Sequence, residues 1–401
     1  MRHKSFFSQP KSSGGQAFRN GRPVRTQRPK RQGAYINPAK FVNKAVTPSE
    51  QPEFVPKHNF ASFDFSDGLK KNIINKNYIT PTPIQDEAIP PILLGRDLIG
   101  LANTGTGKTA AFMLPIIQRL LGANRQGLAL IIVPTRELAV QIDEDFRAFA
   151  RGLQLYAALC VGGASMHYQI TAIKRRPQVV IGTPGRLKDL VNQGVLQLGG
   201  ANFLVLDEAD RMLDMGFIRD IRYLISKLPA KRQSLCFSAT ITPDIERLIH
   251  EILIDPITVS VRQGETSMHV EQDVISAGTK EKKLEILCEL LGRPDFEKVL
   301  IFGHTKHGVQ KLADSLIKHR ISATAIHGNK SQAQRQKALK AFKTGQVKVL
   351  VATDVAARGL DIPDVSHVIN FDQPNTYDDY IHRIGRTGRA GKQGQALTFV
   401  T

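Results

Sequence analysis

Short apolar runs alternate with amphipathic, helix-like stretches along most of this chain. In the first half the apolar runs lie at residues 97–100, 128–133, 179–181, 203–206 and 234–237. Continuous apolar runs of this length are typical of parallel strands buried on both faces, with helices as the crossovers. The pattern weakens between residues 255 and 278, where Gly264, Glu265 and Ser267 indicate a hinge.

Strand-like runs then resume in the second half of the chain. They lie at residues 299–302, 324–326, 347–351, 367–370 and 396–400. We therefore predict an α/β fold of two domains, each a mostly parallel sheet covered by helices. The predicted boundaries are 58–262 for the first domain, 263–275 for a linker and 276–401 for the second domain. One large doubly wound sheet is the alternative. It is less favoured because a chain of 401 residues is long for a single hydrophobic core.

Residues 1–57 show neither strand-like apolar runs nor a helical pattern. Prolines and a Gly-Gly pair interrupt the sequence, and no apolar face develops. We predict a disordered basic tail. It holds 12 Lys and Arg against two acids, Glu50 and Glu53, so it carries +10 of the total +19. Such a tail suits a polyanion such as nucleic acid, but a solvated linker without a partner explains it equally well. An organellar transit peptide is a third interpretation, which the prolines disfavour.

The remaining composition excludes several classes of protein. The cysteines, Cys160, Cys236 and Cys288, lie too far apart for a disulfide framework or a Cys-rich zinc site, and they suit a reducing compartment. No apolar run approaches the roughly 20 residues of a membrane span, and the N-terminus has no apolar signal region. We expect a cytoplasmic protein.

A glycine-rich segment follows the first strand-like run and precedes a helix-like stretch at 110–121. Its sequence is Ala-Asn-Thr-Gly-Thr-Gly-Lys-Thr at 102–109. In this context the backbone N–H groups of Thr104, Gly105, Thr106 and Gly107 can point at phosphate oxygens. Lys108 would reach the β- and γ-phosphates of ATP, and the Thr109 hydroxyl would bind Mg²⁺. Ala102 stands where the generic pattern has Gly, so this is a variant phosphate-binding loop.

The tetrad Asp-Glu-Ala-Asp at 207–210 comes directly after a buried strand-like run. Asp207 would hold Mg²⁺ at the tip of the strand, and Glu208 would orient the attacking water. Taken alone, such a tetrad is more often a solvated acidic turn. Its place about a hundred residues after a phosphate-binding loop favours the catalytic interpretation.

With these two motifs and others in the same order, residues 58–401 resemble the DEAD-box ATP-dependent RNA helicases of superfamily 2. The resemblance implies two RecA-like domains joined by a flexible linker, and the compact core with a basic flank suggests a bacterial enzyme of the RhlE kind. The further motifs are Pro-Thr-Arg-Glu-Leu-Ala at 134–139, Gly-Gly at 162–163, Thr-Pro-Gly-Arg at 183–186, Ser-Ala-Thr at 238–240, Gln-Ala-Gln-Arg at 332–335, Ala-Arg-Gly-Leu-Asp at 357–361 and His-Arg-Ile-Gly-Arg-Thr-Gly-Arg at 382–389.

The resemblance implies a role in ATP binding for five further residues. Gln85, in the segment 77–85, matches the family residue whose amide reads the adenine edge. Phe60 matches the ring that stacks on adenine, although a core anchor is the alternative and Phe63 is its nearest rival. Asp361 matches a carboxylate that accepts the ribose hydroxyls. Arg386 and Arg389 match the arginine fingers that reach the γ-phosphate from the second domain. At position 77 the chain has Asn in place of the family's usual Gly.

The resemblance also implies an RNA-binding face and a coupling element. Arg, Thr and Gly suit contacts with phosphate and sugar oxygens, which position a strand without selecting its sequence. Asn329 stands where the family commonly has Asp, which affects one hydrogen bond near Arg335. The implied RNA-binding residues are Arg136, Gly163, Thr183 and Arg186 in the first domain and Arg335 and Thr353 in the second. The implied coupling residues are Ser238, Thr240 and His382.

The implied function is ATP-dependent unwinding or remodelling of RNA, with ATP and Mg²⁺ as cofactors. We expect a monomer that contacts the RNA backbone, with ribosomal particles or RNA-decay proteins as further partners. Three alternatives stay open: an ATP-gated RNA clamp with little unwinding, a DNA helicase of the same superfamily, and an ATP-independent annealing factor acting through residues 1–57. The family's second domain usually closes with a further helix, so the chain, which ends at Thr401, is either a fragment or a shortened fold.

Overall fold

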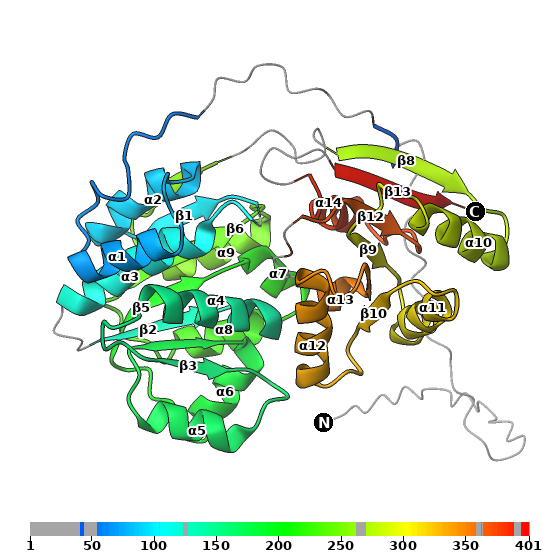
Figure 1. Ribbon diagram of the computed structural model, residues 1–401. Coiled ribbons are helices and arrows are strands. Elements are labelled where there is room, and N and C mark those ends of the chain that lie inside the picture. The colour runs from blue at the N-terminus through cyan, green and yellow to red at the C-terminus, as the bar shows by residue number, and fades with distance from the viewer. Residues whose placement is uncertain are drawn as a thin grey trace, which may run out of the picture. The chain divides into compact units, whose positions relative to one another are not determined.

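The computed structural model describes residues 41–43, 54–103, 105–122, 127–261, 270–357, 362, 364–388 and 394–400 (Figure 1). Two parallel sheets organise these residues, one in each half of the chain. This arrangement confirms the predicted α/β fold class. None of the helices that the structure describes is long and apolar enough to cross a bilayer.

The first sheet is built from β1 to β7, which pair in the order β3-β4-β2-β5-β6-β1-β7. All of its pairings are parallel. The strands are β1 (Leu98–Leu101), β2 (Leu128–Ile132), β3 (Ala157–Cys160), β4 (Val179–Gly182), β5 (Ala201–Leu206), β6 (Gln233–Ser238) and β7 (Ile257–Ser260). The helices of this domain are α1 (Asp67–Asn75), α2 (Pro83–Leu93), α3 (Lys108–Gly122), α4 (Arg136–Phe149), α5 (Met166–Lys174), α6 (Pro184–Asn192), α7 (Ala209–Asp214), α8 (Ile218–Ile225) and α9 (Pro243–Ile252).

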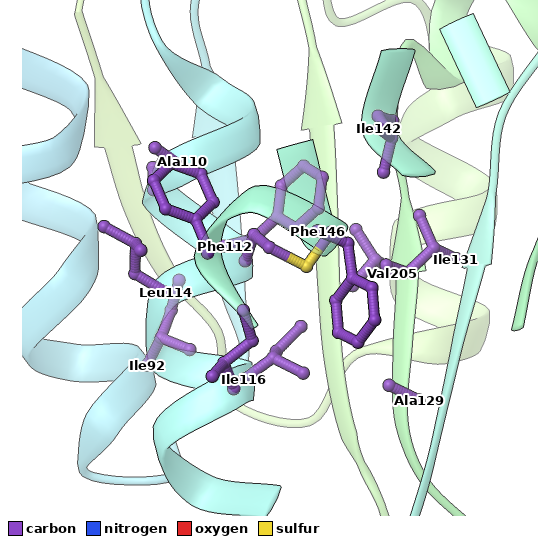
Figure 2. Close-up of a cluster of buried hydrophobic side chains, with 14 of the residues drawn as sticks. Ile92, Ala110, Phe112, Leu114, Ile116, Ala129, Ile131, Ile142, Phe146 and Val205 are labelled. Carbon is purple, nitrogen blue, oxygen red and sulfur yellow. The ribbon is translucent and has the colours of Figure 1, made fainter. Parts of the chain in front are cut away.

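Helices cover both faces of the first sheet. Successive side chains of a strand point to opposite faces, so each strand contributes apolar side chains to both layers. Helices α1 to α4 bury apolar side chains on one face, where Phe112, Phe146 and Ile131 belong to one cluster (Figure 2). On the other face, α5 to α9 cover the neighbouring strand residues, such as Leu130. The central strands therefore have no face in contact with solvent, which explains their continuous apolar runs.

The second sheet repeats this plan with β8 to β13, which pair in the order β10-β11-β9-β12-β13-β8, all parallel. Helices α12 to α14 cover one face and helices α10 and α11 the other. The elements are β8 (Val270–Ser276), α10 (Lys280–Leu291), β9 (Val299–Phe302), α11 (Lys306–Lys318), β10 (Ala323–Ile326), α12 (Gln332–Lys343), β11 (Val349–Ala352), α13 (Asp354–Ala357), β12 (His367–Asn370), α14 (Tyr377–Ile384) and β13 (Gly394–Val400).

The structure differs from the predicted boundaries at both junctions. Residues 270–275, expected in the linker, form most of β8. In the segment expected to be a tail without structure, Phe41 is fully buried and the Lys57 backbone N–H donates to the Asp86 carboxylate at 2.9 Å. Neither segment has a continuous apolar run that could have marked it in the sequence. β8 is an edge strand that contains polar residues, and Phe41 is one buried side chain in a polar segment. The other residues of 1–57 lie outside the described chain, apart from 42–43 and 54–56.

Candidate active site

The glycine-rich loop lies between the end of β1 and Lys108, the first residue of α3. Gly105 and Gly107 have φ angles of +88° and +95°, a backbone region that L-amino acids with a side chain rarely adopt. At Gly107 an added Cβ would also lie 2.4 Å from the amide nitrogen of Gln85. Both glycines are therefore required for the loop to curl at the helix N-terminus, as the sequence predicts. Thr104 lies outside the described residues.

The first turn of α2 holds this loop in place. Thr82 and Gln85 form a capping box, in which Gln85 Oε1 accepts the Thr82 backbone N–H at 2.9 Å. Gln85 Nε2 donates to the Gly107 carbonyl at 3.1 Å, and the Thr82 hydroxyl donates to the Thr106 carbonyl at 2.8 Å. The Gln85 amide therefore has one protein partner on its oxygen and one on its nitrogen, and a primary amide can accept two and donate two hydrogen bonds. Its adenine-reading role stays a prediction.

Phe60 lies in an aromatic cluster next to this turn. Its side chain is 5% exposed, and its ring centroid is 6.0 Å from that of Phe63 and 5.8 Å from that of Tyr78. The ring thus serves as a core anchor here, and stacking on adenine stays a prediction. Asn77 has a φ of +57°, which explains why Gly or Asn suits this position.

Lys108 and Asp207 meet at the bottom of a pocket at the carboxyl edge of the sheet. Lys108 is 6% exposed; its ammonium donates to the Ala102 carbonyl at 3.0 Å and lies 4.0 Å from the Asp207 carboxylate. The pocket is also lined by Thr109 and Glu208. Burial raises the pKa of Asp207 to about 6, with Glu208 and Asp210 adding to the rise and Lys108 opposing it.

These residues fit a magnesium ion. Mg²⁺ prefers oxygen donors and usually takes one or two from the protein and the rest from phosphate and water. Asp207 offers a carboxylate that is 2% exposed and lies beside like charges, so a divalent cation would compensate its charge. Thr109 offers a hydroxyl in the same pocket. Among the described residues there is no group of three or more His, Cys, Asp or Glu side chains that could hold a metal without such help.

Glu208 is held by a residue that the sequence analysis missed. It sits at the start of α7 with a φ of +54°, and its carboxylate accepts a hydrogen bond from Arg211 Nη1 at 3.0 Å. Both side chains are nearly buried, at 3% and 5% exposure. A buried charge pair of this kind orients the carboxylate strongly. The spacing of three residues, which places two side chains on one face of a helix, was the signal that could have indicated it.

Asp210 connects the acidic tetrad to the segment Ser238–Thr240. One of its carboxylate oxygens accepts the backbone N–H groups of Ala239 at 2.9 Å and Thr240 at 3.1 Å. The Ser238 hydroxyl donates to the Thr240 carbonyl at 2.8 Å. The structure thus places the predicted coupling segment against the end of the tetrad. The sequence analysis assigned no role to Asp210.

In the second domain, His382 and Arg386 lie on α14 and in the turn that follows it. They line a small pocket with Phe302, Asp354 and Asp379, and the Arg386 side chain is 3% exposed. To reach a phosphate, the Arg386 guanidinium would have to leave this pocket. Asp361 and Arg389 lie outside the described residues.

Arg383 is a further residue that the sequence analysis missed. It is 1% exposed, and its guanidinium binds both carboxylate oxygens of Asp354, at 2.6 and 2.8 Å. It also donates to the Asn370 side chain at 3.0 Å and to the Asp372 carbonyl at 2.7 Å. Arg383 therefore ties α14 to α13 and to the end of β12. An Arg between Ile381 and Ile384 could have indicated this buried role.

We expect Arg383→Met to lower the free energy of unfolding of the second domain by about 3–5 kcal/mol, because it leaves Asp354 and buried polar groups without their partner. Thermal and urea unfolding would measure this. Arg293→Met is the matched control, since Arg293 is exposed at the end of α10, and it should change stability by less than ~0.5 kcal/mol. Equal stability of both variants would contradict the assigned role.

The predicted RNA-binding residues of the first domain come together. Arg136 begins α4 after β2, Gly163 follows β3, and Thr183 follows β4 as the N-cap of α6. Gly163 has a φ of +75°, and a Cβ there would lie 2.2 Å from the Arg136 guanidinium. Arg186 donates to the Ala164 carbonyl at 3.4 Å. Three neighbouring strands therefore end in one group of cationic and hydroxyl side chains.

The predicted RNA-binding residues of the second domain lie near the carboxyl edge of its sheet. Thr353 follows β11 directly, and its carbonyl accepts the first backbone hydrogen bonds of α13. Arg335 lies in the first turns of α12, the helix between β10 and β11. Asn329, which replaces the usual Asp, accepts from the Lys306 ammonium at 2.9 Å.

The strand order divides the edge of the first sheet between two sets of residues. In the nucleotide pocket the loop residues follow β1 and the tetrad residues follow β5, with β6 between these two strands, and α4 also contributes Gln141 and Glu144. The predicted RNA-binding set follows β2, β3 and β4, which are neighbours. Ligands of parallel α/β sheets bind outside the carboxyl ends of the strands. The two sets meet where β2 pairs with β5.

Known protein families match both halves of the chain. Residues 82–248 match the family described as DEAD/DEAH box helicase, and residues 282–391 match the helicase conserved C-terminal domain. The chain is 45% identical over 343 residues to the ATP-dependent RNA helicase CshA of Limosilactobacillus reuteri, covering 85% of this chain and 69% of that protein. It is 43% identical over 342 residues to the DEAD-box ATP-dependent RNA helicase CshA of Bacillus subtilis (strain 168), with the same two coverages.

Solved structures show the same likeness. S. cerevisiae Dbp5 bound to RNA and ADP BeF3 is 32% identical with a TM-score of 0.74, covering 84% of this chain and 88% of that one. The DEAD-box helicase Mss116 bound to ssRNA and UDP-BeF is 31% identical with a TM-score of 0.77, covering 86% of this chain and 76% of that one. By its motifs, its fold and these relatives, the chain is a member of the DEAD-box family of ATP-dependent RNA helicases.

Proposed function

We propose that this chain binds ATP at the 102–109 loop, binds RNA across the ends of β2, β3 and β4, and uses ATP hydrolysis to unwind or remodel short RNA duplexes. The observation that carries this proposal is that one sheet edge holds both the glycine-rich loop with the acidic tetrad, after β1 and β5, and the predicted RNA-binding residues, after β2, β3 and β4. Two solved relatives, one bound to RNA and ADP BeF3 and one to ssRNA and UDP-BeF, support the same assignment.

In this mechanism Lys108 draws the β- and γ-phosphates into the curled loop, whose N–H groups hold the phosphate oxygens. Thr109 and Asp207 would hold Mg²⁺, which when bound neutralises the developing phosphate charge. Glu208, oriented by Arg211, positions the attacking water. Asp210 holds the segment Ser238–Thr240, so a shift of the tetrad is transmitted to that segment.

The second domain contributes cations in this proposal. Arg386, and Arg389 by resemblance, would neutralise charge on the γ-phosphate when both domains hold one ATP. RNA bound to both domains would favour that arrangement, and ATP would then favour RNA binding by the same factor. The RNA-binding residues are Arg, Thr and Gly, which address the backbone, so we propose little sequence preference.

The test is ATP turnover measured without nucleic acid, with structured RNA and with the DNA of the same sequence. We expect stimulation by RNA well above that by DNA, because contacts to 2′-hydroxyls distinguish the two. Release of a labelled strand from a short RNA duplex, with ATP and without, then separates unwinding from clamping. Equal stimulation by DNA would favour a DNA helicase, and RNA-stimulated turnover without strand release would favour a clamp.

The basic tail gives a second test of RNA binding. Residues 1–35 hold nine Lys and Arg and no acid. Each phosphate contact with a single strand adds about 0.7 to the slope of log K against log salt. We expect deletion of residues 1–35 to weaken RNA binding and to flatten this slope, measured by fluorescence anisotropy between 50 and 300 mM KCl. An unchanged slope would show that the tail is only a spacer.

A further inference from the structure

Part of the segment that precedes the first domain is packed into the second domain. Phe41 is 0% exposed and belongs to the apolar cluster that α12, α13 and α14 form on one face of the second sheet. Its ring centroid lies 4.7 Å from that of Tyr380 on α14. In Figure 1 this short segment is the dark blue piece next to β8. A fully buried Phe at a position so far from its neighbours in sequence indicates a specific socket.

The backbone of the same segment pairs with the edge of the sheet. β8 is the last strand of the second sheet, with β13 on one side only. Asn43 forms an antiparallel bridge to Gln272 of β8, with N–H to O distances of 3.0 and 2.8 Å in the two directions. An exposed edge offers unpaired backbone groups to any extended chain, and main-chain pairing plus a side-chain pocket is a common mode of peptide recognition.

The socket and the edge form one site. The Tyr380 hydroxyl donates to the Gln272 side-chain carbonyl at 2.9 Å, so the ring that contacts Phe41 is bonded to the residue that pairs with Asn43. Val270, which is fully buried at the start of β8, belongs to the same cluster as Phe41. The site therefore combines an aromatic contact from Tyr380, an apolar contact surface that includes Val270, and backbone pairing with Gln272.

The occupant of this site is covalently joined to the other domain. Ten residues, 44–53, separate Asn43 from Phe54, and Lys57 and His58 donate their backbone N–H groups to Asp86 on α2 at 2.9 Å. From Asn43 to Phe54 an extended chain spans at most about 40 Å. The direct connection from Val261 to Val270 spans at most about 32 Å. The two domains are thus joined by two tethers anchored at different points.

We propose that residues 41–43 are a strap: they dock on the β8 edge and the Tyr380 socket of their own chain and limit how far the two domains separate and swivel. One tether fixes only a maximum distance, whereas two tethers at separate points also restrict rotation. The strap reduces the conformational freedom that domain closure must remove.

The test compares Phe41→Ala with Phe54→Ala in the full chain. Phe54 is the matched control because it is the same residue type at the other end of the tether and is 42% exposed. Hydrogen exchange of peptides that contain Gln272 measures docking, and small-angle X-ray scattering without ligands measures the maximum dimension. We expect Phe41→Ala to lower protection at Gln272 by ~10-fold or more and to increase the maximum dimension, with no change for Phe54→Ala.

A second variant keeps the docked residues and lengthens the tether. Insertion of ten Gly and Ser residues after Pro48 adds up to ~35 Å of reach. Here we expect protection at Gln272 to stay as in the parent while the maximum dimension increases. Because this variant leaves Phe41 in place, it separates the strap from the stability of the second domain.

Two outcomes would overturn the proposal. Unchanged protection at Gln272 in Phe41→Ala would show that the segment does not dock in solution. An unchanged maximum dimension in the lengthened variant would show that docking does not restrain the domains. Both readouts are independent of ATP and RNA, so a failure of the strap is distinguishable from a failure of the proposed function.

Discussion

Replacement of Glu208 by Gln should leave ATP binding intact and lower RNA-stimulated turnover by about 10²–10⁴-fold, the contribution typical of a positioned general base. The Glu208 carboxylate is nearly buried and oriented by Arg211, so it is the side chain in the pocket best placed to orient a water. Gln keeps an oxygen that can accept the Arg211 hydrogen bond. The substitution therefore removes the charge and basicity while it conserves the shape.

Binding of a fluorescent ATP analogue and single-turnover hydrolysis would measure the two effects separately. Glu285→Gln is the matched control, because Glu285 is exposed on α10, and it should leave both unchanged. Trapping of RNA by the Glu208→Gln protein with ATP would further support the assignment. Turnover within a few-fold of the parent would remove Glu208 from the proposed mechanism.

Arg386→Gln should lower turnover by about 10³-fold or more, since an arginine that neutralises charge on the transferring phosphoryl group contributes ~10³–10⁵. It should change the affinity for ATP much less, because most of the proposed ATP contacts lie in the first domain. In the structure Arg386 is 3% exposed in a second-domain pocket beside Asp354 and Asp379. The proposed role requires this side chain to move out when both domains bind one nucleotide.

This requirement gives the prediction a second readout. If Arg386 moves, hydrogen exchange of peptides from α14 should change when RNA and a non-hydrolysable ATP analogue are added to the parent. The same addition should leave hydrogen exchange of α14 unchanged in Arg386→Gln. Arg383→Lys provides a contrast. Arg383 belongs to a buried network, so we expect this substitution to lower the stability of the second domain more than it lowers ATP turnover. If Arg386→Gln hydrolyses ATP at the parent rate while folded, Arg386 serves only the packing of α14.

The positions of the central strands follow from the sequence with errors of one or two residues. β9 and β12 agree with the predicted ranges, and β1, β2 and β4 differ by a residue. These strands are covered on both faces, so nearly every residue is apolar and the run itself marks the strand. The glycine-rich loop and the acidic tetrad could also be located from the sequence. Each lies within a few residues of the strand that positions it, so a local pattern is enough to find it.

Three strands went unpredicted, and all are edge strands: β3 and β7 of the first sheet and β8 of the second. Their burial alternates or is partial, as in β3, where every second residue is only half-buried. An edge strand has one neighbour and incomplete cover, so polar residues are tolerated, as in β7 and β8, where they interrupt the apolar run. For this reason β8 was placed in the linker. β3 is apolar throughout, but its run is short and half of its residues are alanine.

The sequence by itself determined the family and the fold class, and it predicted the residues of the candidate nucleotide pocket. Only the tertiary structure decided which of them contact each other. It paired Glu208 with Arg211, placed Arg383 in a buried network and put Phe41 into the second domain. Local patterns record whether a position is buried, because burial depends on the period of the element. Partners are set by how distant segments pack, and one chain's periodicity carries no information about that.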